Sequence, residues 1–171
     1  MLKIFNDLEP FFQDCYERIN VRAYARIRNI SPPSASKLLY ELQKEGLLIR
    51  EENRNYIYYA ANKDSKLFIE LSRIYWYQKL MLSGLTVHLE KEFVKPMVIL
   101  FGSFSKAEVY KNSDIDLAIF STTAKQVRLK AFEAKLGRNI QLFQFKNKDD
   151  VTSAELLNNI LNGFILSGTW Y

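Results

Sequence analysis

The chain has 171 residues, enough for one ordinary domain or two small ones. Its composition, 48% hydrophobic and 25% charged, is typical of a globular protein and excludes a wholly disordered chain. The net charge is +5, and the stretch from Arg18 to Arg54 holds twice as many basic as acidic residues. This distribution favours a polyanionic partner.

The sequence contains no apolar run close to the roughly 18–20 residues that span a bilayer. The longest run near the middle is Met97–Phe101. The first residues lack the apolar core and the small-residue cleavage site of a signal peptide. The single cysteine, Cys15, excludes an internal disulfide and a thiolate metal cluster. We therefore expect a cytoplasmic protein with no membrane partner.

The first third of the sequence predicts three helices followed by a β-hairpin. Ser31 and Pro32 form a helix-start signal, because serine caps free amides and proline fits the first turn. Gly46 suits the C-terminal end of this helix. Residues 47–50 and 56–59 are strand-like runs on either side of a turn. The apolar positions on one face of the helix are Ala35, Leu38, Leu39 and Leu42.

Residues 31–48 resemble the recognition helix of winged helix-turn-helix transcription regulators, and the resemblance covers about residues 15–61. The shared pattern is a serine-capped helix, a Leu-x-x-Leu pair and a Glu-Gly-Leu exit into the wing. It implies double-stranded DNA as a partner, with helix side chains at base edges and arginines at phosphates. The implied DNA-binding residues are Arg22, Arg26, Pro33, Ser34, Ser36, Lys37, Tyr40, Arg50 and Arg54. The alternative is a protein-binding module with solvated arginines.

A helical connector is predicted between the two ends of the chain. We expect it over about residues 65–93, bent or interrupted at Gly84. Its apolar face is wider than one small domain covers, so it packs between domains or pairs with its copy in a homodimer. His88, the only histidine, is expected to be a packed or surface residue. The apolar positions at helical spacing are Leu67, Leu71, Ile74, Met81 and Leu85.

The last third of the sequence carries the sharpest functional pattern. Val98–Phe101 is an apolar strand that runs into Gly102 and Ser103, and Asp114 and Asp116 follow after ten residues. On a strand, these two carboxylates point to one face while their neighbours enter the core. Carboxylates about 7 Å apart suit a divalent cation. Glycine and a hydroxyl at a strand-to-helix junction suit a phosphate. Phosphoryl or nucleotidyl transfer needs this combination.

Residues 102–117 resemble the signature of minimal nucleotidyltransferases of the DNA polymerase β superfamily: Gly-Ser, ten residues, then Asp-x-Asp preceded by serine. The resemblance runs from about Met97 to the end of the sequence, and residues 157–166 resemble the family's closing helix and strand. It implies a mixed sheet flanked by helices, Mg²⁺ or Mn²⁺, and a nucleoside triphosphate, for which we expect ATP. The implied nucleotide-binding residues are Gly102, Ser103, Lys106 and Ser113, and the implied metal-binding and catalytic residues are Asp114 and Asp116.

Two departures from the family pattern bear on catalysis. Ala107 stands where the family commonly has glycine. The third carboxylate is expected on the strand at residues 139–145, where the matching position is Gln141, an uncharged amide. Its loss weakens the metal that activates the nucleophile more than the metal that accompanies the triphosphate. The acids that remain as substitutes are Glu133, Asp149 and Asp150.

The sequence predicts an α+β protein with an N-terminal winged helix (residues 1–61), a helical connector (62–95) and a C-terminal mixed-sheet nucleotidyltransferase fold (96–171). One hypothesis is a DNA-binding regulator whose C-terminal domain binds nucleotide with weak or absent catalysis. A second is an active nucleotidyltransferase that modifies a protein or a small acceptor. A third is an antitoxin-like role, in which the domain modifies or masks a partner protein.

Overall fold

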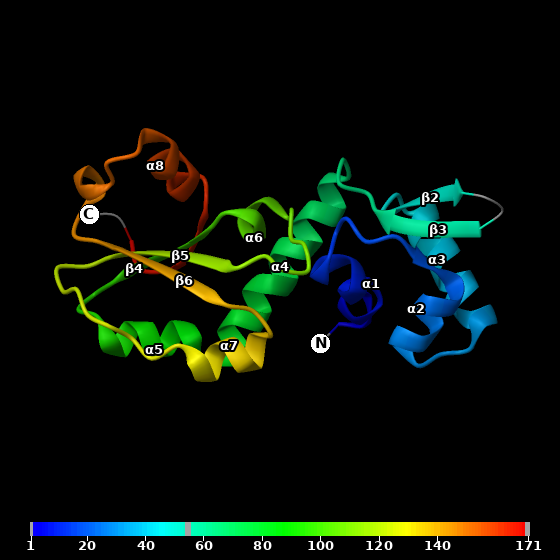
Figure 1. Cartoon of the computed structure of the whole chain (residues 1–171), viewed down its shortest axis with the longest axis horizontal. Coiled ribbons are helices and arrows are strands. Elements are labelled where there is room, and N and C mark those ends of the chain that lie inside the picture. The colour runs from blue at the N-terminus through cyan, green and yellow to red at the C-terminus, as the bar shows by residue number, and fades with distance from the viewer. Residues whose placement is uncertain (1, 54–55, 170–171) are drawn as a thin grey trace. The chain divides into compact units, whose positions relative to one another are not determined.

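The computed structural model describes residues 2–53 and 56–169 (Figure 1). The chain divides into two compact units: unit 1 comprises Met1–Tyr75 and Ala107–Lys111, and unit 2 comprises Trp76–Lys106 and Asn112–Tyr171. The fold class is α+β, with helices in both units and two separate sheets. Within the described residues, no helix combines the length and the apolar character needed to cross a membrane.

Before the connector, unit 1 contains three helices and a hairpin, together with a short additional strand. Its elements are α1 (Lys3–Gln13), β1 (Ile19–Asn20), α2 (Val21–Arg28), α3 (Pro32–Lys44), β2 (Leu48–Asn53) and β3 (Tyr56–Ala61). The strands form an antiparallel sheet in the order β1-β3-β2. Ser31 caps α3 by accepting the backbone amide of Ser34, as the sequence predicts. The side chains of α3 that enter the core are Ala35, Leu39 and Leu42.

A buried ion pair fixes α1 against α2. The Asp7 carboxylate is almost fully buried and accepts a hydrogen bond from Arg28 at 3.0 Å. The Tyr24 hydroxyl donates to the backbone carbonyl of Asp7 at 2.7 Å. Burial, with the nearby Asp7 charge as a second cause, raises the pKa of Tyr24 to about 12. Tyr24 therefore stays neutral and keeps its donor role at any physiological pH.

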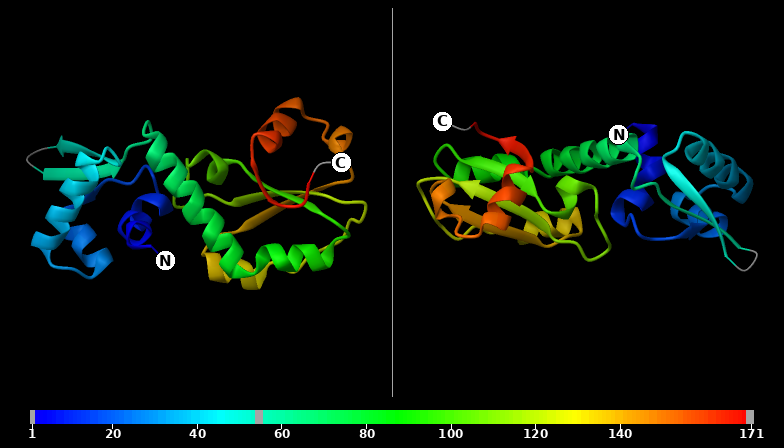
Figure 2. Two further views of the ribbon diagram at one scale, coloured as in Figure 1. Left: turned by 180° about the vertical axis from the view of Figure 1, so that it is seen from behind. Right: turned by 90° about the horizontal axis from the view of Figure 1, so that it is seen from above.

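The connector consists of two helices rather than one, as the Gly84 expectation allows. α4 (Lys66–Ser83) begins in unit 1 and ends in unit 2, and α5 (Leu85–Glu92) follows directly. Gly84 has φ +83°, a left-handed conformation that glycine adopts without a steric penalty. Figure 2 shows the change of direction at this point. Homodimerisation through the connector is not tested by a single chain and stays a prediction.

Unit 2 is built on a mixed four-stranded sheet in the order β6-β5-β4-β7. β5 pairs with β6 in parallel and with β4 antiparallel, and β7 pairs antiparallel with β4. The elements are β4 (Met97–Phe101), α6 (Ser103–Lys106), β5 (Ile115–Phe120), α7 (Lys130–Leu136), β6 (Ile140–Phe145), the 3₁₀ helix η1 (Lys148–Asp150), α8 (Ala154–Leu161) and β7 (Phe164–Ser167). The closing helix and strand lie where the sequence predicts them.

The central strands of unit 2 are buried on both faces, which explains their continuous apolar sequences. Figure 1 shows α8 over one face and α5 and α7 along the other. Under α8, alternate residues of β4 and β5 pack with Val151 and Ile160. These alternate residues are Met97, Ile99, Phe101, Ala118 and Phe120. Asp116 occupies the same face by its position two residues before Ala118.

Candidate active site

Asp114 and Asp116 lie at one end of the central strands of unit 2, where β4 ends and β5 begins. β5 starts at Ile115, directly after Asp114. Asp116 sits opposite Phe101, the last residue of β4, and is aligned with Gln141 on the parallel strand β6. Asp116 and Gln141 are therefore neighbours on the face that α8 covers. The sequence placed the missing third carboxylate at Gln141, and the register puts Gln141 beside Asp116.

Gly102 makes this arrangement sterically possible. It connects β4 to α6 with φ +70°, and a Cβ atom built on it would stand 2.3 Å from Asp116 Oδ2. Any side chain at this position would displace the carboxylate. The Ser105 hydroxyl donates to the Gly102 carbonyl at 2.9 Å and closes the turn.

A buried aromatic cluster anchors the turn that carries Ser103. Phe104, the next residue, is fully buried and meets Trp76 edge-to-face with ring centroids 4.6 Å apart. The Arg138 guanidinium lies 5.7 Å from the Trp76 ring centroid and 6.0 Å from that of Phe104. This packing fixes the turn that contains Gly102 and Ser103 at the end of β4.

Asp114 is held by two side-chain amides. Gln141 Nε2 donates to Asp114 Oδ2 at 2.7 Å, and Asn139 Nδ2 donates to Asp114 Oδ1 at 3.1 Å. Both carboxylate oxygens are therefore engaged by donors from the start of β6. A glutamine amide offers a donor at one end and an acceptor at the other. A half-turn of the Gln141 amide would present its oxygen toward the carboxylates instead.

The Asp116 carboxylate lies in an environment that favours a bound cation. Asp116 is half-buried, and burial together with the charge of Asp114 raises its pKa above the usual value. A cation between the two carboxylates would relieve both effects. The donor set consists of oxygens, which suits Mg²⁺ or Mn²⁺, and Mg²⁺ often takes only one or two carboxylates in addition to substrate phosphates. The residues therefore fit the metal that accompanies a triphosphate.

A third charged ligand is absent from the described part of the chain, where no three His, Cys, Asp or Glu side chains come together. Glu133 is engaged elsewhere, since its Oε1 accepts the backbone amide of Ile140 at 3.0 Å. Asp149 and Asp150 follow the C-terminal end of β6, whereas Gln141 lies at its beginning. Neither Asp149 nor Asp150 therefore takes the place of the carboxylate that is missing at Gln141.

The other predicted nucleotide-binding residues lie around the turn. Lys106 is exposed, and its Nζ donates to Asn159 Oδ1 on α8 at 3.0 Å. Ser113 is buried directly before Asp114. Ala107 has φ +58°, so the backbone keeps a left-handed conformation where the family commonly has glycine.

Two amides of this site were missed in the sequence. Asn139 lies two residues before Gln141, so strand alternation alone would have placed it on the same face. Asn159 comes from α8, and nothing in the sequence indicates that it meets Lys106. The position of Asn139 could have been inferred from local periodicity, whereas the contact made by Asn159 depends on tertiary packing.

The residues proposed to contact DNA lie on the surface of unit 1. Among those the structure describes, Arg50 lies 3.7 Å from Glu52 and Lys37 lies 4.0 Å from Glu41, and both pairs are exposed. Such pairs contribute little and open readily. Arg54 lies outside the described residues. The exposed candidates are Arg22, Arg26, Pro33, Ser34, Ser36, Lys37, Tyr40 and Arg50.

Replacing Asp116 by asparagine is expected to stabilise the metal-free protein. At pH 7 the Asp116→Asn variant should melt a few degrees higher in EDTA, because it removes a half-buried charge facing Asp114. The folded-state pKa is raised, so the charge costs stability above that pKa, and the cost disappears as the pH falls toward the unfolded value. The gain should therefore shrink in acid. Thermal unfolding followed by circular dichroism measures it.

The matched control is Asp114→Asn, which disturbs the two hydrogen bonds from Gln141 and Asn139 and should give no such gain. Equal stabilisation by both substitutions, or a gain that is independent of pH, would contradict the electrostatic interpretation.

The comparisons with known proteins agree with this geometry over the C-terminal part of the chain. Residues 87–167 match the family model described as Polymerase beta, Nucleotidyltransferase. No curated protein and no solved structure matches the chain. The matched segment contains the Gly-Ser turn, the Asp-x-Asp pair and the mixed sheet that joins them. This part of the chain is therefore a nucleotidyltransferase-fold domain.

Proposed function

We propose that the protein is a DNA-binding regulator whose nucleotidyltransferase-fold domain binds a metal–nucleoside triphosphate with weak or absent catalysis. The observation that carries the catalytic part is Gln141. It occupies the position expected for the third carboxylate and donates to Asp114 Oδ2 at 2.7 Å. The ligand we propose is ATP with Mg²⁺ or Mn²⁺.

Different residues of the domain would bind the metal and the phosphates. Asp114 and Asp116 would hold the metal, and the Gly102–Ser103 turn would receive the phosphates. Lys106 is close enough to the turn to neutralise phosphate charge after leaving Asn159, because an exposed hydrogen bond costs little to exchange. When bound, the metal would neutralise charge on the triphosphate.

Weak transfer follows from the charge of the site. An activated nucleophile needs a basic, anionic environment to give up its proton. Gln141 supplies an amide where that anion is expected, and its donor hydrogen already satisfies Asp114. Binding the triphosphate requires only the two aspartates, whereas activating an acceptor requires more negative charge than the described residues supply.

Calorimetry tests the binding half of this proposal. A non-hydrolysable ATP analogue should bind in Mg²⁺ or Mn²⁺ and not in EDTA, and the Asp114→Asn variant should lose the metal-dependent binding. Asp114→Asn keeps the size of the side chain and deletes one negative charge, but it also disturbs the hydrogen bonds from Gln141 and Asn139. Asp116→Asn leaves those bonds in place and should lose the metal-dependent binding as well. Binding that is unaffected by EDTA and by these substitutions would refute the metal site.

The DNA-binding half is supported by the arrangement of α2, α3 and the β2–β3 hairpin. α3 buries one face and leaves the opposite face exposed near its N-terminus, the geometry of a helix that enters a major groove. Arg22 and Arg26 are exposed on the preceding helix. Their positions suit contacts to phosphates on either side of such a groove.

The Lys37→Ala variant is expected to bind duplex DNA more weakly without losing the fold. Lys37 is exposed and lies off the buried face of α3. Removal of one positive charge that neutralises phosphate should lower the slope of log affinity against log salt by about 1. Fluorescence anisotropy at several salt concentrations measures both effects.

Lys44→Ala is the matched control, because Lys44 is exposed on the same helix but stands at its C-terminal end. Equal losses in both variants would indicate non-specific attraction to a basic protein. Absence of duplex binding by the unmodified protein at low salt would favour the protein-binding alternative.

A further inference from the structure

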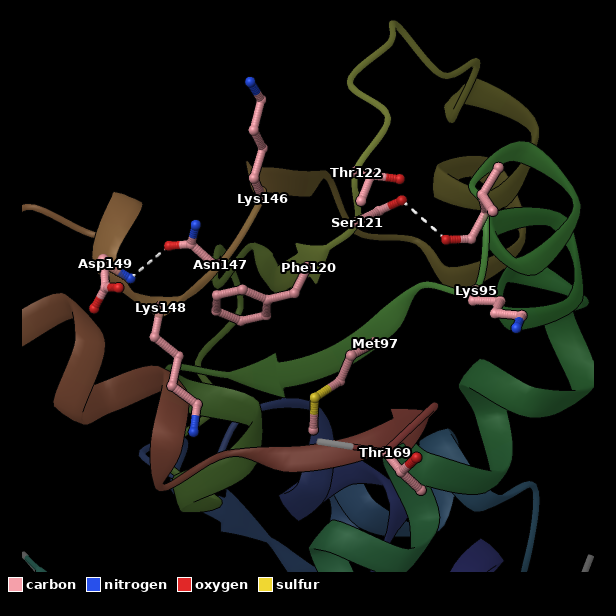
Figure 3. A pocket seen from close by; sticks show the side chains of 11 residues that line it. Lys95, Met97, Phe120, Ser121, Thr122, Lys146, Asn147, Lys148, Asp149 and Thr169 are labelled. Carbon is pink, nitrogen blue, oxygen red and sulfur yellow. Dashed lines mark hydrogen bonds between the residues drawn. The ribbon is translucent and has the colours of Figure 1, made fainter. Parts of the chain in front are cut away.

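A pocket lies in unit 2 at the end of the sheet opposite to the carboxylates. Its volume is about 610 Å³ (Figure 3). Met97 and Phe120 are paired at this end of β4 and β5, whereas Phe101 and Asp116 are paired at the other end. Four residues of strand at about 3.3 Å each separate the two sites by about 13 Å. The pocket is therefore distinct from the candidate active site.

The walls of this pocket are held in place by their own hydrogen bonds. The Ser121 hydroxyl donates to the Val94 carbonyl at 3.2 Å. Asn147 Oδ1 accepts the backbone amide of Asp149 at 2.8 Å, an interaction also drawn in Figure 3. On the third side, a Cβ on Gly168 would stand 2.5 Å from the Pro96 carbonyl, so this close approach depends on glycine. The pocket is built before a ligand arrives, as small-molecule sites commonly are.

The lining of the pocket is positively charged. Lys95, Lys146 and Lys148 line it, and Asp149 is the one acid among the described lining residues, so these side chains sum to +2. Asp150 stands next to the pocket but does not line it, and its Oδ2 accepts the backbone amide of Lys146 at 2.9 Å. Lys95 has φ +45°, a conformation uncommon for residues other than glycine, and lies at the rim. The charge selects for an anion.

The floor of the pocket is apolar. Met97 and Phe120 form it, and Figure 3 shows them between Lys95 on one side and Lys148 on the other. A methionine and an aromatic ring offer favourable contacts to a planar ring system. Thr169 adds a hydroxyl at the edge for polar atoms of such a ring. A ligand that fits has a flat body over the floor and a charged end at the rim.

We propose that this pocket binds a nucleoside monophosphate, with the base over Met97 and Phe120 and the phosphate at Lys95 on the rim. A phosphate monoester carries about −1.5 to −2 charges at pH 7, opposite in sign to the +2 of the lining. A triphosphate would bring more charge than the lining balances. The volume lies in the range of sites that hold ligands of this size. The site needs no metal, because lysine binds phosphate directly as a point charge.

Calorimetric titration in EDTA tests the proposal separately from the metal-dependent site. AMP, GMP, CMP and UMP are titrated in turn. Adenosine, which lacks the phosphate, and inorganic phosphate, which lacks the nucleoside, are titrated for comparison. We expect at least one monophosphate to bind, and adenosine and phosphate to bind much more weakly. Lys95→Gln should weaken binding by about tenfold or more, the effect of one charge-assisted contact, and Lys148→Gln, on the opposite side of the floor, should weaken it less. Lys91→Gln, an exposed lysine of α5 outside the pocket, should have no effect.

The Asp116→Asn variant distinguishes this site from the candidate active site, and it should bind the monophosphate as the unmodified protein does. The proposal is overturned if none of the four monophosphates binds up to millimolar concentration. It is also overturned if inorganic phosphate binds as tightly as the nucleotides. Loss of binding in Asp116→Asn with retention in Lys95→Gln would place the ligand at the carboxylates instead.

Discussion

The Gln141→Asp variant is expected to transfer AMP from ATP about 10²–10³ times faster than the unmodified protein, the effect of one well-placed electrostatic group in a transition state. Gln141 is aligned with Asp116 on the adjacent strand, so an aspartate there would join the two existing carboxylates. A third negative charge would rebuild the ligand set that activates the nucleophile. Labelled ATP, followed by pyrophosphate release and by label on the protein, measures the gain.

The same substitution should cost stability when no metal is present. Three carboxylates would then share one site, and Asp114 would lose the 2.7 Å hydrogen bond from Gln141. Thermal unfolding should show a lower melting temperature in EDTA and recovery in Mg²⁺. Gln141→Asn is the neutral control and should change neither transfer nor metal dependence. A Gln141→Asp protein that binds metal but transfers no faster would show that the third carboxylate is not what limits the chemistry.

The Gly102→Ala variant is expected to lose most metal-dependent triphosphate binding. Its Cβ would stand 2.3 Å from Asp116 Oδ2, so the carboxylate must leave its position beside the turn. The backbone penalty of placing alanine at φ +70° is about 1–2 kcal/mol. Calorimetry with the non-hydrolysable analogue should show at least about a tenfold loss of affinity, since a misplaced charged ligand forfeits a charge-assisted contact.

The Gly137→Ala variant separates the steric effect of Gly102→Ala on Asp116 from the backbone penalty of that substitution. Gly137 has φ +66°, and a Cβ there would meet nothing within 4 Å. It should therefore share the backbone cost of Gly102→Ala and leave triphosphate binding unchanged. If both alanine variants bind normally, or if both lose binding equally, the steric account of Gly102 is wrong.

Local features of the fold were predictable because they depend on neighbouring residues. The start of α3 follows from Ser31 and Pro32, and its buried face follows from helical spacing. The break at Gly84 follows from the conformational freedom of glycine. The alignment of Gln141 with Asp116 was expected from the family signature, and strand register produces it.

Features that depend on distant residues were not predictable. The hydrogen bond from Lys106 to Asn159 joins residues 53 positions apart, and the pocket at Met97 and Phe120 combines segments from four parts of the chain. The assignment of residues 107–111 to unit 1 also lies beyond local patterns. Such contacts are set by how the elements pack, and periodicity describes only one element at a time.

Pyrophosphate release by the unmodified protein tests the central claim most directly. With protein in excess over labelled ATP and Mg²⁺ present, we expect ATP to be bound and recovered intact. Release should be no faster than in Asp114→Asn and at least about 100-fold slower than 1 s⁻¹, the lower bound of typical enzyme turnover. Release near or above about 1 s⁻¹ that disappears in Asp114→Asn would contradict the account and identify the protein as an active nucleotidyltransferase.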